Sequence, residues 1–392
     1  MKSEGLKISS ENILIGLFVI NVIVSMLASF SLYQFPGMTS ILMLLLIITY
    51  IIVSKSKGML SVDFRDAKIF GVTWALVYLL SALTSSRIPG LGLWVSLLYG
   101  VLFLCLKEGK QEKILHAYVW TLSVLLCFSI VEYGIYQATG RGIVLGNTYR
   151  STGYKDSFFV QLLFNLVRTD LTIPRFQGLT NEPGLLGTLC GMLLFYTYRE
   201  RKLKVPYYIF LLSGIISFSL AFYFIFVIHF LFVVRPDFKA LIAVVLVLLV
   251  SSQLLKERFE FLLIERVVLS EDIDNRTTDS FDDAFYRAYD QGILWLGVGY
   301  HNVDSLGSDL EGGNSGAKFW ILQYGVIGFI IVMVGYVRLY FHRCGRKLIL
   351  YDWIFMIVFW LSFYQRQTIY TPYTILVFFA VPLASKQLRI KN

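Results

Sequence analysis

The ten residues RFQGLTNEPG, Arg175 to Gly184, place an arginine, an asparagine and a glutamate directly ahead of the apolar run LLGTLCGMLLFYTY. Asn181 or Glu182 can cap a helix that starts here, and Pro183 suits its first turn. A cap does not account for Arg175, because the positive end of a helix dipole favours anions. An arginine beside a helix N-terminus forms a cradle for an anion such as phosphate. The segment therefore predicts a phosphate site at the N-terminus of a helix. Glu182 would serve there either as the helix cap or as a catalytic base.

Other polar residues could take part in the same chemistry. Arg276 and Arg287 lie in one polar segment, and Arg366 lies in YQRQTIY between two apolar runs. Each of these arginines either binds a substrate phosphate or anchors the chain to lipid headgroups. His301 can accept or donate a proton, and its alternative is a solvated loop histidine. Glu132, near the end of an apolar run, either faces a cavity or reaches up to water.

The elements that position these residues are apolar runs. Hydrophobic residues make up 56% of the 392-residue chain and charged residues only 16%, which excludes a soluble globular protein. Runs of about 20 apolar residues or somewhat fewer can each cross a bilayer. We expect about twelve such spans, at 12–33, 38–54, 69–86, 91–106, 115–138, 183–198, 205–217, 218–234, 240–255, 317–340, 348–364 and 371–385. The sequence therefore predicts an all-α, polytopic integral membrane protein with a single membrane domain, residues 1–392.

The basic residues predict the topology. Loops such as RERKLK and HRCGRK and the tail SKQLRIKN carry an excess of Lys and Arg, and they alternate with loops that do not. Under the positive-inside rule, both termini are then cytoplasmic. Counting the stretch from Val205 to Val234 as two short spans, interrupted at SGIISFS, keeps every later loop on its preferred side.

Two long loops are expected on the outer face, at 139–182 and 256–316. In the second loop, Phe281, Ala284, Phe285 and Ala288 recur at helical spacing. This pattern predicts a short amphipathic helix at the outer membrane–water boundary, with Arg287 on its polar side.

Taken together, these features resemble the bacterial O-antigen polymerase (Wzy) and O-antigen ligase superfamily. The resemblance covers most of the chain and depends on order and topology. It includes about a dozen spans, a first outer loop that ends in RFQGLTNEPGLLG, and a second outer loop with two arginines. After these come the segment LGVGYHN and then the segment NSGAKFWILQYGVIG, which leads into the tenth span.

The resemblance implies a GT-C type glycosyltransferase at the periplasmic face of the bacterial inner membrane. In a polymerase of this kind, the growing glycan moves from undecaprenyl pyrophosphate onto the non-reducing end of a new lipid-linked repeat unit. Arginines and a helix N-terminus can stabilise the departing pyrophosphate without a metal ion or a cofactor. The expected partners are the lipid-linked glycan, the inner-membrane lipids and a chain-length regulator, and nucleic acid is not expected.

The resemblance also implies roles for the candidate residues. Arg175 matches the first-loop arginine of the family, and Arg276 and Arg287 match the second-loop arginines. Glu182 and His301 compete for the role of the base that receives the acceptor's proton. The remaining candidates are substrate contacts: Arg366 for phosphate, Glu132 as a cavity wall, and Asn181 for the pyrophosphate or glycan.

Two alternative functions stay open. An O-antigen ligase, which transfers the glycan to the lipid A core, typically carries a His-Asn pair before the tenth span, where this chain has Gly313. A lipid-linked-sugar flippase or another transporter usually has short loops and ionisable residues between its helices near the membrane midplane. The long polar outer loops favour the polymerase over both.

Overall fold

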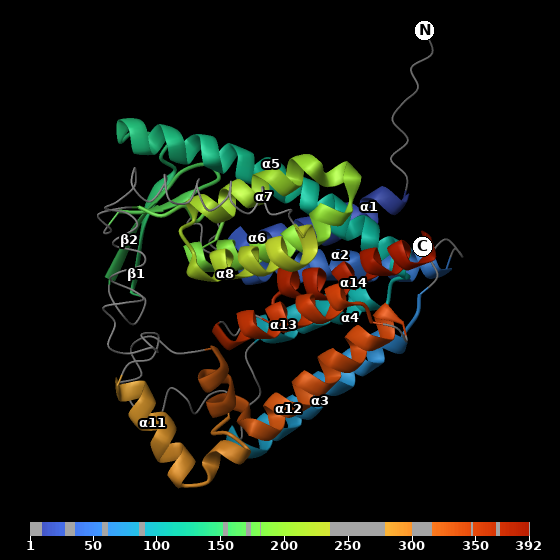
Figure 1. Cartoon of the computed structure of the whole chain (residues 1–392). Helices are drawn as coiled ribbons and strands as arrows, with labels where there is room; N and C mark the ends of the chain where they lie inside the picture. Colours follow the sequence, from blue (N-terminus) through green and yellow to red (C-terminus); the bar gives the residue numbers. More distant parts are fainter. Residues whose placement is uncertain are drawn as a thin grey trace.

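A computed structural model describes residues 10–27, 36–56, 62–85, 91–151, 156–169, 174–180, 182–235, 279–299, 316–345, 348–365 and 369–391. Figure 1 shows a bundle of helices with a small sheet at its left end, and α14 ends at the right. We call the left end of the bundle the sheet end.

The helices follow the apolar runs of the sequence. They are α1 (Ser10–Met26), α2 (Pro36–Ser56), α3 (Arg65–Ser85), α4 (Leu91–Leu104), α5 (Glu108–Thr139), α6 (Pro183–Arg199), α7 (Lys204–Ile216), α8 (Leu220–His229), α11 (Asp279–Asp290), α12 (Gly316–Cys344), α13 (Leu350–Gln365) and α14 (Pro372–Lys391). Short turns η2 (Arg201–Leu203), η3 (Phe230–Val234) and η5 (Ile293–Trp295) adjoin them. Every predicted span within the described residues overlaps a helix, and the span predicted at 240–255 lies outside them.

The lengths and surfaces of the helices indicate a membrane protein. Helices α3, α5 and α12, of 21, 32 and 29 residues, are long and apolar enough to cross a membrane. Leu79 and Leu83 of α3 are largely exposed, as expected for side chains that face lipid. Several other helices are shorter, and α7 has only 13 residues, so the number of crossings stays a prediction.

The first long loop contains a sheet, so the prediction of an all-α chain is wrong here. Strands β1 (Gly146–Ser151), β2 (Asp156–Gln161) and β3 (Leu166–Arg168) are antiparallel in the order β1-β2-β3. Phe159 is buried and its neighbour Phe158 is exposed, which is the alternation of a strand with one covered face. This alternation spans too few residues to stand out beside the long apolar runs.

The predicted break between residues 205 and 234 is confirmed. Helix α7 ends at Ile216, α8 begins at Leu220, and Phe218 between them has a left-handed φ of 48°. The two helices approach closely, because a Cβ atom on Gly214 would clash with the ring of Phe222. The close approach favours a glycine at this position.

Helix α12 is also interrupted, although its sequence predicts one continuous span. Gly325 leaves the helical conformation, with φ 75° and ψ 167°. The carbonyls of Leu322 and Gln323 accept hydrogen bonds from the N–H groups of Val298 and Gly299, at 2.8 and 3.0 Å. The glycine-rich turn of the second long loop thus satisfies the backbone at the break, as an apolar environment requires.

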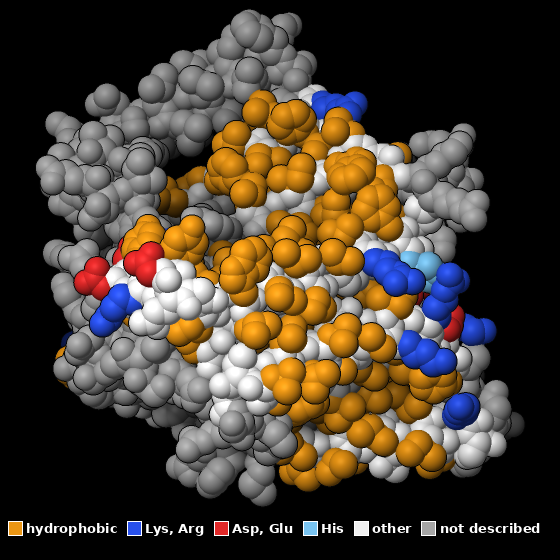
Figure 2. Space-filling view, turned by 90° about the horizontal axis from the view of Figure 1, so that it is seen from below, with side chains coloured by type: hydrophobic (Ala, Val, Ile, Leu, Met, Phe, Trp, Pro, Cys, Tyr) orange, Lys and Arg blue, Asp and Glu red, His pale blue; other side chains and the backbone are white. Residues whose placement is uncertain are grey.

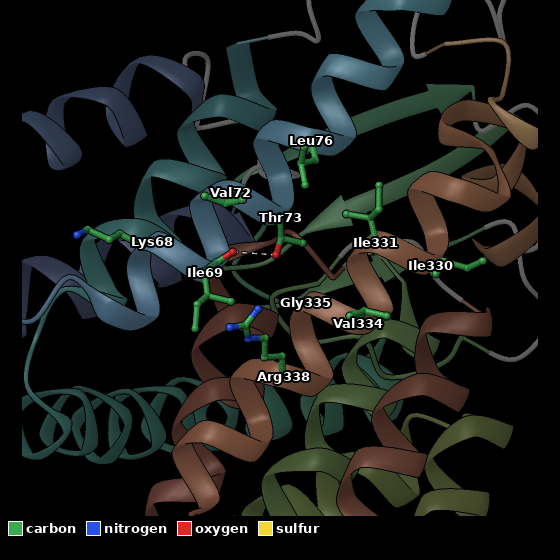
Figure 3. A pocket seen from close by; sticks show the side chains of 10 residues that line it. All are labelled: Lys68, Ile69, Val72, Thr73, Leu76, Ile330, Ile331, Val334, Gly335 and Arg338. Carbon is green, nitrogen blue, oxygen red and sulfur yellow. Dashed lines mark hydrogen bonds between the residues drawn. The ribbon is translucent and has the colours of Figure 1, made fainter.

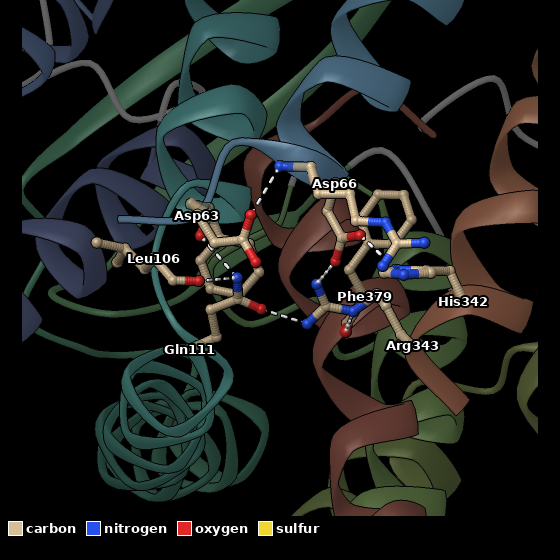
Figure 4. A network of polar contacts seen from close by, with 9 residues as sticks. Asp63, Asp66, Leu106, Gln111, His342, Arg343 and Phe379 are labelled. Atoms are coloured by element: carbon tan, nitrogen blue, oxygen red, sulfur yellow. Dashed lines mark hydrogen bonds and ion pairs between the residues drawn. The ribbon is translucent and has the colours of Figure 1, made fainter. Parts of the chain in front are cut away.

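At the end opposite the sheet, a fully buried arginine joins four helices (Figure 4). Arg343 of α12 donates from Nε to the Phe379 carbonyl of α14 at 2.7 Å and from Nη1 to Asp66 Oδ2 of α3 at 3.0 Å. Its Nη2 donates to Gln111 of α5, and Asp66 Oδ1 also contacts His342 Nδ1 at 2.7 Å. The sequence places Arg343 in a loop between two spans, and this is wrong because α12 continues through Cys344; the cytoplasmic side assigned to this end stays a prediction.

Replacement of Arg343 by leucine should strongly destabilise the fold. The change removes the donors to Asp66 and Gln111, and an uncompensated buried charge costs about 3–5 kcal/mol. We expect the thermal midpoint of the detergent-purified protein to fall well below that of Lys204→Leu, which removes an exposed cation. Equal midpoints for the two variants would show that the cluster contributes little to stability.

Candidate functional site

The segment of residues 174–180 is held where the second half of α5 meets the start of α6. The Tyr133 hydroxyl of α5 donates to the Pro174 carbonyl at 2.6 Å. The Tyr133 and Phe176 rings pack edge to face, with 5.3 Å between their centroids. The Leu166 N–H of β3 donates to the Gly178 carbonyl at 3.0 Å. These contacts fix the backbone on both sides of Arg175, and Tyr133 is a positioning residue that the sequence reasoning missed.

The half-buried side chain of Arg175 binds the break between α7 and α8. Its Nε donates to the Ser217 carbonyl at 3.2 Å, and its Nη2 donates to the Phe218 carbonyl. The last carbonyls of a helix have no partner within the helix, and they form the negative end of its dipole. The negative end of the α7 dipole therefore explains why a cation stands at position 175. Capping of α6 does not explain it.

Glu182 occupies the N-cap position of α6 without capping through its side chain. Its backbone is extended, with φ −145° and ψ 134°, and its side chain accepts no cap hydrogen bond. The Glu182 carbonyl instead accepts from the N–H groups of Leu185 and Leu186, and from Thr180 Oγ1 at 2.9 Å. The interpretation of Glu182 as a side-chain cap is therefore wrong, while Pro183 opens the helix as predicted.

Glu182 is exposed, so its carboxylate stands at the surface beside the positive end of the α6 dipole. An exposed carboxylate at this position is accessible to an acceptor hydroxyl. Arg175, seven residues earlier in the same segment, brings a cation to the same end of the bundle.

Glu132 of α5 holds the loop between β2 and β3. Its Oε2 accepts a hydrogen bond from the Phe164 N–H at 2.9 Å, and Ser129, one turn earlier, donates to the Phe164 carbonyl. The carboxylate is half-buried. Through this contact Glu132 anchors the loop between β2 and β3 to α5, and its place at a cavity or reaching up to water stays a prediction.

Arg287 lies on α11, whose apolar face packs in a small hydrophobic cluster separate from the main core. Phe281, Ala284 and Ala288 form the buried face of this helix, while Arg287 is exposed and donates from Nε to the Asp283 carbonyl at 3.2 Å. The two predicted faces are confirmed. The buried face packs against η5 and α12, with Leu322 in the same cluster.

The described candidates thus divide into two groups. Arg175, Glu182 and Glu132 are tied to the first long loop and to the helices beneath it, whereas Arg287 belongs to the cluster around α11. Four candidates lie outside the described residues: Asn181, Arg276, His301 and Arg366.

The first group can bind an anion and transfer a proton. The N–H groups that open α6 attract negative charge, and the Arg175 guanidinium can share a phosphate bidentately. The Glu182 carboxylate can accept a proton from a hydroxyl. Comparison with protein-family models, curated proteins and solved structures finds no match to this chain.

Replacement of Arg175 by glutamine should destabilise the α7–α8 break. Removing donors from buried carbonyls costs about 1–3 kcal/mol, so we expect a lower thermal midpoint. Arg175→Lys should recover part of the loss, because a lysine also interacts with a helix C-terminus.

The matched control is Arg141→Gln, which removes an exposed arginine at the sheet end. A midpoint for Arg175→Gln equal to that of the control would contradict a structural role for the guanidinium.

Proposed function

We propose that the chain is an O-antigen polymerase of the Wzy class, a GT-C type glycosyltransferase at the periplasmic face of the bacterial inner membrane. The observation that carries this proposal is the joint placement of Arg175, the N-terminus of α6 and the exposed carboxylate of Glu182 at one end of an apolar bundle. The resemblance of the sequence to the Wzy and ligase superfamily supports it.

The substrates fit an arrangement of this kind. A polyprenyl pyrophosphate keeps its hydrocarbon chain among apolar helices, so its charged groups must lie near the helix ends. Arg175 lies at such an end, and it is attached to the break between α7 and α8 rather than to a free loop. A guanidinium already oriented by protein carbonyls reorganises little when negative charge develops beside it.

The reaction transfers a glycosyl group. The acceptor hydroxyl oxygen forms a bond to the anomeric carbon of the growing glycan, and the bond from that carbon to the pyrophosphate oxygen breaks. The electron pair of the broken bond remains on undecaprenyl pyrophosphate, next to Arg175 and the α6 N-terminus. The hydroxyl proton passes to a base, for which Glu182 and His301 are the candidates.

The remaining candidate residues have supporting roles in the proposed glycosyl transfer. Arg276 and Arg287 contact the lipid-linked glycan from the second long loop, Arg366 is a further phosphate contact, and Asn181 is a contact for the pyrophosphate or glycan. Glu132 contributes indirectly, by holding the first loop on α5. A chain-length regulator is the proposed protein partner.

Reconstitution with a defined substrate tests the proposal. The full chain in lipid nanodiscs should convert undecaprenyl-pyrophosphate-linked repeat units into a ladder of longer glycans and release undecaprenyl pyrophosphate. In cells, loss of a polymerase leaves single repeat units on lipopolysaccharide, loss of a ligase leaves none attached, and loss of a flippase stops export before either step. A pure, folded protein that never lengthens the glycan would refute the assignment.

Replacement of Glu182 by glutamine should abolish polymer formation without unfolding the protein. The Glu182 backbone, not its side chain, closes the start of α6, and glutamine keeps the size of glutamate, so we expect a folded protein with little change in its thermal midpoint. Loss of a general base lowers the rate about 10²- to 10⁴-fold, which the density of the ladder measures. Glu200→Gln, at the other end of α6, is the matched control. Normal ladders from Glu182→Gln would remove Glu182 as the base.

A further inference from the structure

A groove lies between α3 and α12, far along both helices from the sheet end. It has a cavity volume of about 480 Å³, within the range of about 300–1,000 Å³ for ligand pockets. Its apolar walls include Val72 and Leu76 of α3 and Ile330 and Val334 of α12, each between 45% and 60% exposed. Hydrophobic side chains cover the middle of this face of the molecule, and Lys and Arg side chains gather at one end (Figure 2).

Close packing of the two helices forms the floor of the groove. Gly335 of α12 lies against Thr73 of α3, where a Cβ atom would clash with the threonine side chain. Thr73 is buried, and its hydroxyl donates to the Ile69 carbonyl at 2.8 Å, so this hydroxyl already has an acceptor within its own helix. The larger side chains on either side then stand as walls above a narrow apolar floor.

Two cations stand at one end of the groove. Lys68 lies one turn before Val72 on α3, and Arg338 lies one turn after Val334 on α12, so the antiparallel helices bring both cations to the same end (Figure 3). Both side chains are exposed. Among the residues that the structure describes, neither Lys68 nor Arg338 has an ion-pair partner.

The Asp66 carboxylate, two residues before Lys68 on α3, is already engaged by other cations. Asp66 of α3 is shared between Arg343 Nη1 at 3.0 Å and His342 Nδ1 at 2.7 Å. A ligand with its own negative charge is therefore the complement of Lys68 and Arg338. From these cations the groove extends over about 12 Å of helix, the rise of eight residues from Lys68 to Leu76.

We propose that the α3–α12 groove binds an anionic phospholipid, with an acyl chain along Val72, Leu76 and Val334 and the phosphate between Lys68 and Arg338. The combination of an open apolar channel with cations at only one end matches an amphiphile that lies along the helices. An arginine binds phosphate oxygens bidentately, and a lysine supplies a second positive charge.

This lipid site is distinct from the proposed glycosyl-transfer site. Lys68 is one turn from the start of α3, and Arg338 is near the end of α12, at the end of the bundle where Arg343 binds Asp66. Arg175 and Glu182 lie at the sheet end. The charge bias of the loops assigns the Arg343 end to the cytoplasmic leaflet, whose anionic lipids attract basic residues near a helix end. The inference therefore does not depend on the polymerase assignment.

Native mass spectrometry of the full chain tests the proposal. The probes are dioleoyl phosphatidylglycerol and dioleoyl phosphatidylcholine, titrated into detergent-purified protein. Wild type should bind phosphatidylglycerol more tightly than phosphatidylcholine. The double variant Lys68→Gln/Arg338→Gln should lose roughly thirtyfold in affinity for phosphatidylglycerol, from the combined effect of two cations near a lipid surface.

Two further variants separate the groove from general surface charge. Lys202→Gln/Lys204→Gln removes two exposed cations outside the groove and should leave phosphatidylglycerol binding unchanged. Val334→Trp narrows the groove and should weaken binding of both lipids, with the thermal midpoint showing that the variant is folded.

Three results would overturn the proposal. One is an equal loss of binding in the two double variants, and another is full binding by Val334→Trp. The third is a dimer peak that Val334→Trp abolishes, because the groove would then be an interface between two copies of the chain.

Discussion

A helix that is interrupted inside an apolar bundle leaves backbone carbonyls without partners in the helix, and the two long loops supply donors for them. At the α7–α8 break, Arg175 donates to two carbonyls; at the Gly325 break of α12, the backbone of Val298 and Gly299 does so. An unmatched buried group costs about 1–3 kcal/mol, so each loop stabilises the break that it contacts. The described parts of the two long loops are therefore structural members of the bundle, and each is fixed at a defined point.

At the end of the bundle opposite the sheet, side chains rather than loop backbone provide the hydrogen bonds for buried polar groups. Arg343 binds α3, α5 and α14 at once, and Gln111 turns its own N–H groups to the carbonyls of Phe103 and Leu106 at the end of α4. A charge with hydrogen bonds on several sides can remain buried. Because α5 runs from Gln111 in this cluster to Tyr133 and Glu132 near its other end, the cluster helps to set where α5 presents these two residues to the first loop.

The sequence predicts elements whose physical signal is local. Long apolar runs define the helices, and the apolar spacing of residues 281–288 defines the amphipathic α11 with both of its faces. What the sequence does not predict depends on contacts between distant residues. The partner of Arg175 is 42 residues away and that of Arg343 is 277 residues away, and no local pattern indicates either pairing. The sheet is missed for a related reason, since short strands are stabilised by their neighbours.

The contacts of Arg175 bear on its proposed role in catalysis. A guanidinium bound to two carbonyls has a structural explanation, but the same bonds give it a fixed orientation at the end of an apolar bundle. Electrostatic stabilisation of a departing pyrophosphate depends on charges that are already in place, so a structural role for Arg175 is compatible with the proposed one. Glu182 differs, because its side chain makes no cap bond and α6 starts through its backbone. The helix start therefore does not by itself explain a glutamate at this position.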